Sequence, residues 1–138
     1  FMISVAVGSV MRYYREFPQE DIKEMLIRAV DDLIENCLMD NALFYYKELP
    51  SLARLGNNTL LLESLAIAYE LTGDKKYLAP GLETFKRAIY EKPSTINGQK
   101  REEEDAVIGA GSSTKGFAQS FIPLITYYKA LSENDMRW

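Results

Sequence analysis

Glu63 is the residue of this sequence best placed for acid–base chemistry. It lies one turn into an otherwise apolar segment that is expected to form a helix over residues 59–72. A carboxylate in apolar surroundings must be paired, hydrogen-bonded or protonated, and a protonated glutamate is able to act as a general acid. The structural alternative is that Glu63 interacts with the dipole at the helix N-terminus or faces solvent. Glu63 is therefore the candidate catalytic residue, whereas Glu70, near the end of the same helix, is expected at the surface or in a salt bridge.

The composition excludes most other catalytic and binding chemistry. The chain contains no histidine, which removes histidine-based triads and imidazole zinc sites, and its single cysteine, Cys37, excludes an internal disulfide and a multi-cysteine metal site. Sixteen Lys and Arg against twenty Asp and Glu give a net charge of −4 without a basic block, so nucleic acid is a poor partner. The sequence has no apolar run of about 18 residues, so no membrane span is expected. We expect neither a metal nor a cofactor.

A glycine-rich segment over residues 106–114 partly resembles nucleotide-binding loops, because an apolar stretch precedes Gly109 and Gly111. Thr114 stands where the dinucleotide fingerprint has a third small residue, and no strand–helix–strand unit surrounds the segment. The phosphate-binding pattern of a Walker loop fails too, because Lys115 follows a threonine rather than a glycine. The segment is therefore expected to be a loop ahead of a helix.

Hydrophobic periodicity predicts five helices, of which the first, third and fifth are apolar around most of their circumference and the others carry one apolar stripe. The expected helices cover residues 2–17, 19–38, 59–72, 74–91 and 115–132. Asn58 or Thr59 is the expected N-cap of the third helix. Pro80 and Gly81 are expected to interrupt the fourth helix or delay its start, and Pro123 to kink the fifth or delay its start. Residues 39–58 are expected to form a structured connection with one short helical turn.

A repeat underlies this alternation of helices. Similar sequences that end in Tyr14, Tyr69 and Tyr128 fall near the ends of the first, third and fifth helices, with the tyrosines 55 and 59 residues apart. A repeat of this kind indicates stacked antiparallel helical hairpins, with an inner layer of odd-numbered helices backed by an outer layer of even-numbered ones. The expected fold is all-α, in a single domain over residues 1–138.

The stretch from Leu61 to Leu78 resembles the hairpin signature of the (α/α) toroids, the six-hairpin glycosidase and polysaccharide-lyase group. The residues that carry the resemblance are Ala66, Tyr69, Thr72, Gly73 and Asp74. Gly73 suits the left-handed residue that ends a helix, and Asp74 is able to cap the next one. Because five helices do not close a ring of six hairpins, the resemblance implies either an arc of a larger toroid or a small domain that covers its open ends by association.

The resemblance also implies a function, that of a bacterial carbohydrate-active hydrolase or lyase in which this chain forms a wall of the sugar cleft and is inactive alone. In such toroids the cleft lies at the loops that lead into the inner helices. The substrate-binding residues that this implies are Asn57, Asn58, Thr59, Ser112, Lys115 and Gln119. The implied partner is an oligo- or polysaccharide, and the implied location is secreted or periplasmic. The alternative is a helical-repeat module that binds a protein partner.

Overall fold

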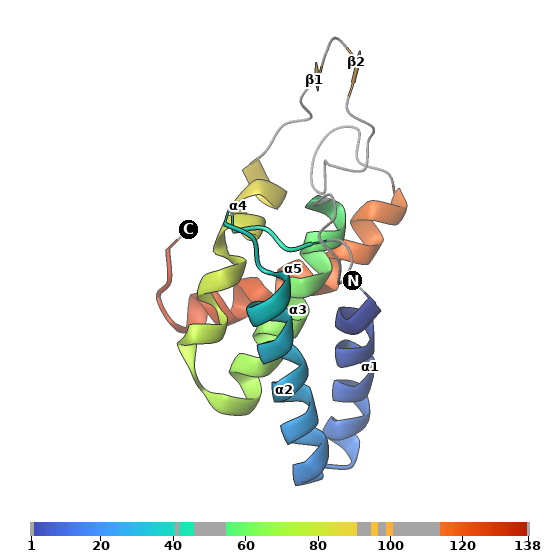
Figure 1. Cartoon of the computed structure of the whole chain (residues 1–138), viewed down its shortest axis with the longest axis vertical. Coiled ribbons are helices and arrows are strands. Elements are labelled where there is room, and N and C mark those ends of the chain that lie inside the picture. Colours follow the sequence, from blue (N-terminus) through green and yellow to red (C-terminus); the bar gives the residue numbers. More distant parts are fainter. Residues whose placement is uncertain are drawn as a thin grey trace.

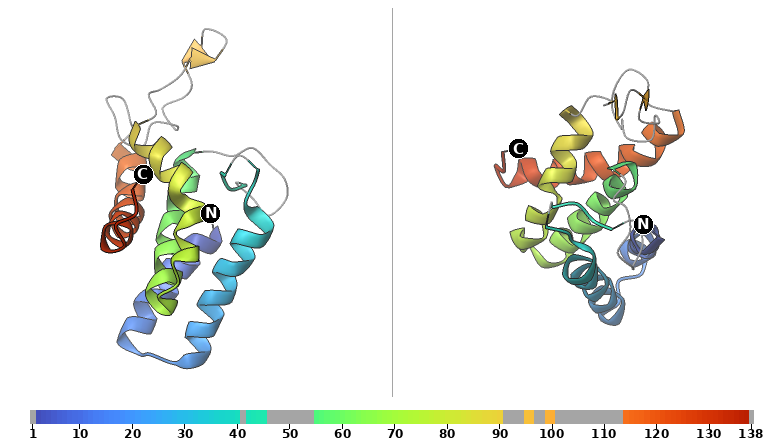
Figure 2. Two further views of the ribbon diagram at one scale, coloured as in Figure 1. Left: turned by 90° about the vertical axis from the view of Figure 1, so that its left-hand side faces the viewer. Right: turned by 45° about the horizontal axis from the view of Figure 1, so that its top comes forward.

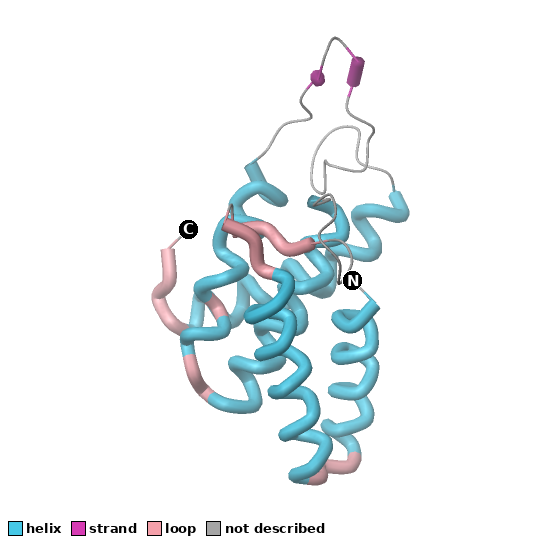
Figure 3. Tube along the Cα trace, viewed as in Figure 1, coloured by secondary structure: helices cyan, strands magenta, loops and turns pink. Residues whose placement is uncertain are grey.

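The computed structural model describes residues 2–40, 42–45, 55–90, 95–96, 99–100 and 114–137. Helices dominate this part of the chain (Figure 1, Figure 3). They are α1 (Met2–Glu16), α2 (Glu20–Cys37), α3 (Leu55–Thr72), the short 3₁₀ turns η1 (Lys75–Tyr77) and η2 (Ala79–Gly81), α4 (Leu82–Tyr90) and α5 (Thr114–Glu133). Two-residue strands, β1 (Thr95–Ile96) and β2 (Gln99–Lys100), pair antiparallel. The prediction of an all-α fold is confirmed.

α3 lies at the centre of the molecule and packs against each of the other four α-helices. The turned views show α5 on one side of α3 and α2 on the opposite side (Figure 2). The α3 side chains of Leu62, Leu65 and Ala68 are fully buried. This position follows from the sequence of α3, because a helix that is apolar around most of its circumference needs neighbours on several sides.

α1 and α3 run in the same direction, and α2 and α4 run back in the opposite direction (Figure 1). The N-terminal ends of α1, α3 and α5 lie at the same end of the molecule. α1 and α3 pack with Gly8 against the Glu63 carboxylate and with Arg15 bonded to Glu70. In both pairs, Gly8 with Glu63 and Arg15 with Glu70, the two residues are 55 positions apart in the sequence. The spacing that separates Tyr14 from Tyr69 in the sequence is therefore the offset at which the two helices lie side by side.

α3 begins earlier than the sequence predicts. It starts at Leu55 rather than at residue 59, so neither Asn58 nor Thr59 is its N-cap. The Phe44 backbone N–H donates to Asn58 Oδ1 at 2.6 Å, and Asn58 Nδ2 donates to the Phe44 carbonyl oxygen at 3.0 Å. Thr59 Oγ1 lies 2.8 Å from Ser120 Oγ. The capping prediction is wrong because both polar side chains make tertiary hydrogen bonds instead.

The turn that follows α3 forms as its sequence predicts. Gly73 has a φ of 71°, in the left-handed region that glycine enters without strain, and its N–H donates to the Tyr69 carbonyl oxygen at 2.7 Å. Asp74 Oδ1 accepts a hydrogen bond from the Lys76 backbone N–H at 2.9 Å and so caps η1. Pro80 lies in η2, and α4 begins only at Leu82, which confirms the delayed start.

Two further expectations concern the start of α5 and residues 39–58. α5 begins at Thr114 and contains Pro123, so a late start of this helix is wrong. In the connection over residues 39–58, Phe44 forms an isolated β-bridge with Leu38, and residues 55–58 form the first turn of α3. The bridge places Phe44 where its backbone meets the Asn58 amide, which explains why this segment is extended. Residues 46–54 lie outside the described part of the chain.

Tyr127 fixes α5 against the turn between α3 and α4. Its ring is fully buried, 5.5 Å from the Phe85 ring between centroids, and its hydroxyl donates to the Leu78 carbonyl oxygen. Gly81 makes this packing possible, because a Cβ at that position would lie 2.8 Å from side-chain atoms of Leu65 and Tyr127. The sequence thus uses a glycine where a large aromatic side chain crosses the turn.

Candidate functional site

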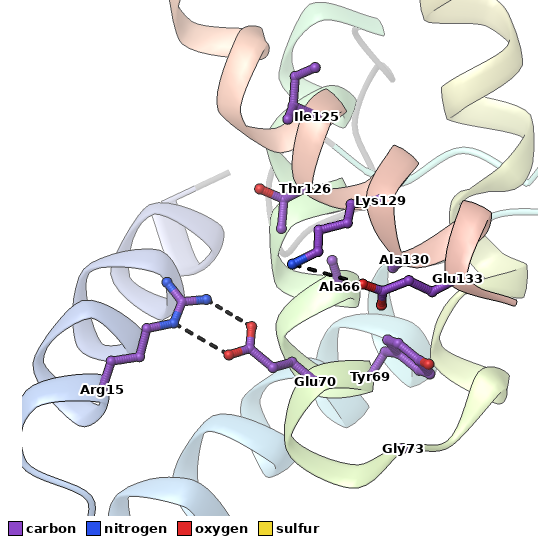
Figure 4. Close-up of a pocket in the computed structure, with 10 residues that line it drawn as sticks. All are labelled: Arg15, Ala66, Tyr69, Glu70, Gly73, Ile125, Thr126, Lys129, Ala130 and Glu133. Carbon is purple, nitrogen blue, oxygen red and sulfur yellow. Dashed lines mark hydrogen bonds and ion pairs between the residues drawn. The ribbon is translucent and has the colours of Figure 1, made fainter.

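A pocket of about 600 Å³ lies between α1, α3 and α5, within the size range of sites that hold small ligands. Figure 4 shows α1 and α5 on two sides of the pocket and α3 between them. The residues that line the pocket are Arg15, Ala66, Tyr69, Glu70, Gly73, Ile125, Thr126, Lys129, Ala130 and Glu133. The lining therefore combines charged groups with small and apolar side chains.

Helical periodicity brings these residues to one face of each helix. On α3, Ala66 and Glu70 are four residues apart, so they lie one above the other, and Gly73 lies in the turn directly after the helix. On α5, Ile125, Lys129 and Glu133 recur every four residues and face the pocket in the same way. Leu62, four residues before Ala66, is fully buried, so the core begins one turn before the pocket on this side of α3. Spacing therefore brings these residues together but does not separate a core face from a pocket face.

The pocket contains a bidentate ion pair between Arg15 of α1 and Glu70 of α3. Arg15 Nη2 donates to Glu70 Oε2 at 2.8 Å, and Arg15 Nε donates to Glu70 Oε1 at 3.4 Å (Figure 4). The hydrogen bond to Glu70 raises the pKa of Arg15, against the desolvation that lowers it, and the nearby Glu63 charge adds to the rise. The guanidinium and the carboxylate are each about half exposed, at 46% and 49%. The pair is therefore fixed in geometry but open to solvent.

A second ion pair lies across the pocket on α5. Lys129 Nζ is 3.8 Å from Glu133 Oε1, four residues along the same helix, and the lysine side chain is 76% exposed. This contact is longer than a hydrogen bond, so it holds the ammonium loosely. The two cations and two carboxylates of the pocket balance one another in charge.

Arg15, Glu70 and Lys129 occupy equivalent places in the sequence repeat. Each directly follows one of the three repeat tyrosines, Tyr14, Tyr69 and Tyr128. The tyrosines are recognisable from the sequence alone, but no local signal predicts a function for the charged residue after each of them. The expectation that Glu70 is salt-bridged is confirmed. The signal that predicts the pocket is therefore the repeat position that follows the tyrosine.

Glu63 lies one turn before Ala66 on the same face of α3, at the seam with α1. Its Oε1 is 3.7 Å from Arg12 Nη2, and its side chain is 18% exposed. Gly8 of α1 gives the carboxylate room, because a Cβ there would lie 3.1 Å from Glu63 Oε2. This arrangement is an ion pair that joins α1 to α3. Because α3 begins at Leu55, Glu63 lies in its third turn rather than its first, so the expected interaction with the dipole at the helix N-terminus is wrong. A catalytic role for Glu63 stays a prediction.

Of the residues predicted for substrate binding, the three whose side chains the structure describes, Asn58, Thr59 and Gln119, do not line this pocket. Asn58 and Thr59 are buried, with relative exposures of 1% and 0%, and their side chains bond to the protein interior. Gln119 is exposed on α5. Asn57 and Lys115 lie in the first turns of α3 and α5, and their side chains are outside the described part of the chain. Ser112 lies outside the described residues altogether.

Among the helices that the structure describes, none combines the length and the apolar character needed to cross a membrane. The described side chains also contain no group of three or more Cys, Asp and Glu placed to hold a metal ion. Comparison of the chain with protein-family models, with curated protein sequences and with solved structures finds no match.

Proposed function

We propose that this chain is a helical-hairpin domain of the (α/α)-toroid type that binds a saccharide on the face shared by α1, α3 and α5. The observation that carries the proposal is that Arg15, Glu70 and Lys129 come from equivalent repeat positions on three helices and line one pocket. Packing of α1 on α3 at an offset of 55 residues supports the repeat on which the toroid resemblance depends. The turn at Thr72, Gly73 and Asp74 supports it as well.

The chemistry of the pocket suits a polyhydroxylated ligand. Sugar hydroxyls both donate and accept hydrogen bonds, and the pocket offers a guanidinium, an ammonium, two carboxylates and the hydroxyl of Thr126. Ile125, which is 51% exposed, supplies apolar surface against which the C–H groups of a sugar ring pack. The proposal is for binding rather than catalysis by the isolated chain. In a larger bacterial hydrolase or lyase the cleft that the resemblance implies would lie at the N-terminal ends of α1, α3 and α5, whereas this pocket lies toward their C-terminal ends, so it would bind a saccharide outside that cleft.

A helical-repeat module that binds protein is the second candidate, and exposed apolar side chains favour it. On α5, Phe121, Ile122, Ile125 and Tyr128 are each 45–51% exposed. Exposed apolar residues on one helix are typical of surfaces that pack against another protein. In this alternative the exposed apolar side chains of α5 contact a partner chain, and the pocket has no ligand of its own.

Thermal denaturation in the presence of oligosaccharides tests the proposal. A ligand at 100 times its Kd stabilises the folded state by about 2.7 kcal/mol, which raises the Tm of a chain of this size by several degrees. Glu70→Ala removes a charged side chain that lines the pocket and should abolish the ligand-dependent rise in Tm. The variant is expected to fold, because an ion pair between half-exposed groups contributes at most about 1 kcal/mol.

Glu83→Ala is the matched control, because Glu83 forms a comparable pair with Arg87 on α4 (Nε to Oε1, 2.8 Å) outside the pocket. This variant should keep the full rise in Tm. If no neutral or acidic oligosaccharide raises the Tm of the unmodified chain, saccharide binding is wrong and the protein-binding module is favoured.

A further inference from the structure

We infer that the pocket between α1, α3 and α5 selects neutral saccharides and rejects those that carry a carboxylate or phosphate. The inference rests on the proposed function and specifies its ligand class. Two observations support this inference. The positive and negative charges around the pocket are equal in number, and each cation that would attract an anion already has a carboxylate beside it.

The Arg15 guanidinium is the group of the pocket best suited to bind an anion, but it is already hydrogen-bonded to the Glu70 carboxylate. Two of its nitrogens face the two Glu70 carboxylate oxygens, at 2.8 and 3.4 Å. A ligand carboxylate that approached the guanidinium would have to displace Glu70 or lie beside it. Both arrangements are unfavourable, because one leaves Glu70 without its cation and the other places like charges together.

The remaining charges of the face follow the same pattern. Lys129 has Glu133 one turn away, at 3.8 Å, and Arg12 has Glu63 at 3.7 Å in the neighbouring seam. Each of these three described cations, Arg12, Arg15 and Lys129, therefore has a carboxylate beside it, and the charges of the three pairs cancel. Sites that bind carboxylates or phosphates present an excess of donors, with arginine aimed at the ligand rather than at a protein carboxylate.

A neutral sugar avoids this penalty and uses both members of each pair. Carboxylate oxygens accept hydrogen bonds from sugar hydroxyls, and Glu70 and Glu133 are 49% and 52% exposed, so solvent reaches both. Arg15 and Lys129 donate to the hydroxyl oxygens of the same ligand. The mixed lining therefore serves as a set of fixed donors and acceptors for a molecule without charge.

Calorimetric titration with matched ligand pairs tests the inference. The probes are neutral oligosaccharides built on glucose, galactose and mannose, each beside the uronate of the same length and linkage in which C6 is oxidised to a carboxylate. We expect the Kd of at least one neutral ligand to be lower than that of its uronate by about tenfold. Glu70→Gln removes the repelling carboxylate, so it should strengthen uronate binding and weaken neutral binding, while Glu83→Gln on α4 should leave both unchanged.

The outcomes separate the inference from the proposed function. If a uronate binds as tightly as its neutral counterpart, or more tightly, the inference is overturned while saccharide binding stands. If Glu70→Gln does not shift the preference toward the uronate, the role assigned to the Arg15–Glu70 pair is overturned. If no ligand of either kind binds, the proposed function itself fails.

Discussion

The side chain of Asn58 should be a main structural support of this fold, and Asn58→Ala tests that role. The amide accepts from the Phe44 N–H and donates to the Phe44 carbonyl oxygen, at 2.6 and 3.0 Å, and both residues are 1% exposed. Alanine at position 58 leaves two buried backbone groups of Phe44 without these partners. Each unsatisfied buried group costs about 1–3 kcal/mol, so the free energy of unfolding should fall by about 2–6 kcal/mol.

Urea denaturation followed by circular dichroism measures this loss, with Asn36→Ala as the matched control. Asn36 also lies in a helix and donates from its amide, to Asp32 Oδ1 at 2.8 Å, but that bond is exposed. Its removal should cost no more than about 0.5 kcal/mol. If Asn58→Ala loses no more stability than Asn36→Ala, the structural account of Asn58 is refuted, and the earlier prediction that it binds substrate regains its basis.

Asn58→Asp adds a dependence on pH to the same test. A carboxylate there keeps the acceptor for the Phe44 N–H but turns an oxygen toward the Phe44 carbonyl oxygen, in a buried place where the charged form is disfavoured. Protonation restores a donor. Relative to the unmodified chain, the variant should therefore be least stable near neutral pH and should lose less stability as the pH falls. A stability difference that is constant with pH would contradict this reasoning.

Two other predictions concern the turn between α3 and α4. Gly81→Ala places a Cβ 2.8 Å from two buried side chains, so it should lower the free energy of unfolding, measured in urea, by about 1–3 kcal/mol. Gly73 has open space around it and a φ of 71°, so Gly73→Ala should cost about 1 kcal/mol through backbone strain alone. Equal losses in the two variants would contradict the packing argument. Burial, followed by the hydrogen bond to Asp31, raises the pKa of Tyr77 to about 12, above its unfolded value near 10. The stabilisation that this provides is complete below about pH 10 and is lost as the pH rises toward about 12, so Tyr77→Phe should show a shallower fall in stability over that interval; an unchanged slope would refute the assignment.

Local sequence was sufficient to predict the helices and the turn at Gly73. Gly73 and Asp74 act on their own neighbours, through a left-handed backbone and a cap, so the sequence around them determines the outcome. The delayed start of α4 followed from Pro80 for the same reason. The predicted start of α3 was wrong because Asn58 forms hydrogen bonds with Phe44, fourteen residues away, instead of capping the helix, and no local sequence signal identifies that partner.

The candidate site was less predictable than the fold. Glu63 was expected to be paired, hydrogen-bonded or protonated, and it is ion-paired, but its partner Arg12 lies on a different helix. Arg15 and Glu70 meet because α1 and α3 pack at the repeat offset, which the tyrosines revealed in the sequence. What the sequence did not reveal was which side of each helix faces the core and which faces the pocket.

The most direct test of the central claim is an NMR titration of the ¹⁵N-labelled chain with a neutral oligosaccharide that the calorimetric panel identifies. If the account is right, saturable shifts should appear at the backbone amides of Arg15, Glu70 and Lys129, on all three helices that line the pocket. The account is contradicted if those amides do not move at millimolar ligand, or if the shifts that appear lie on α2 and α4 instead.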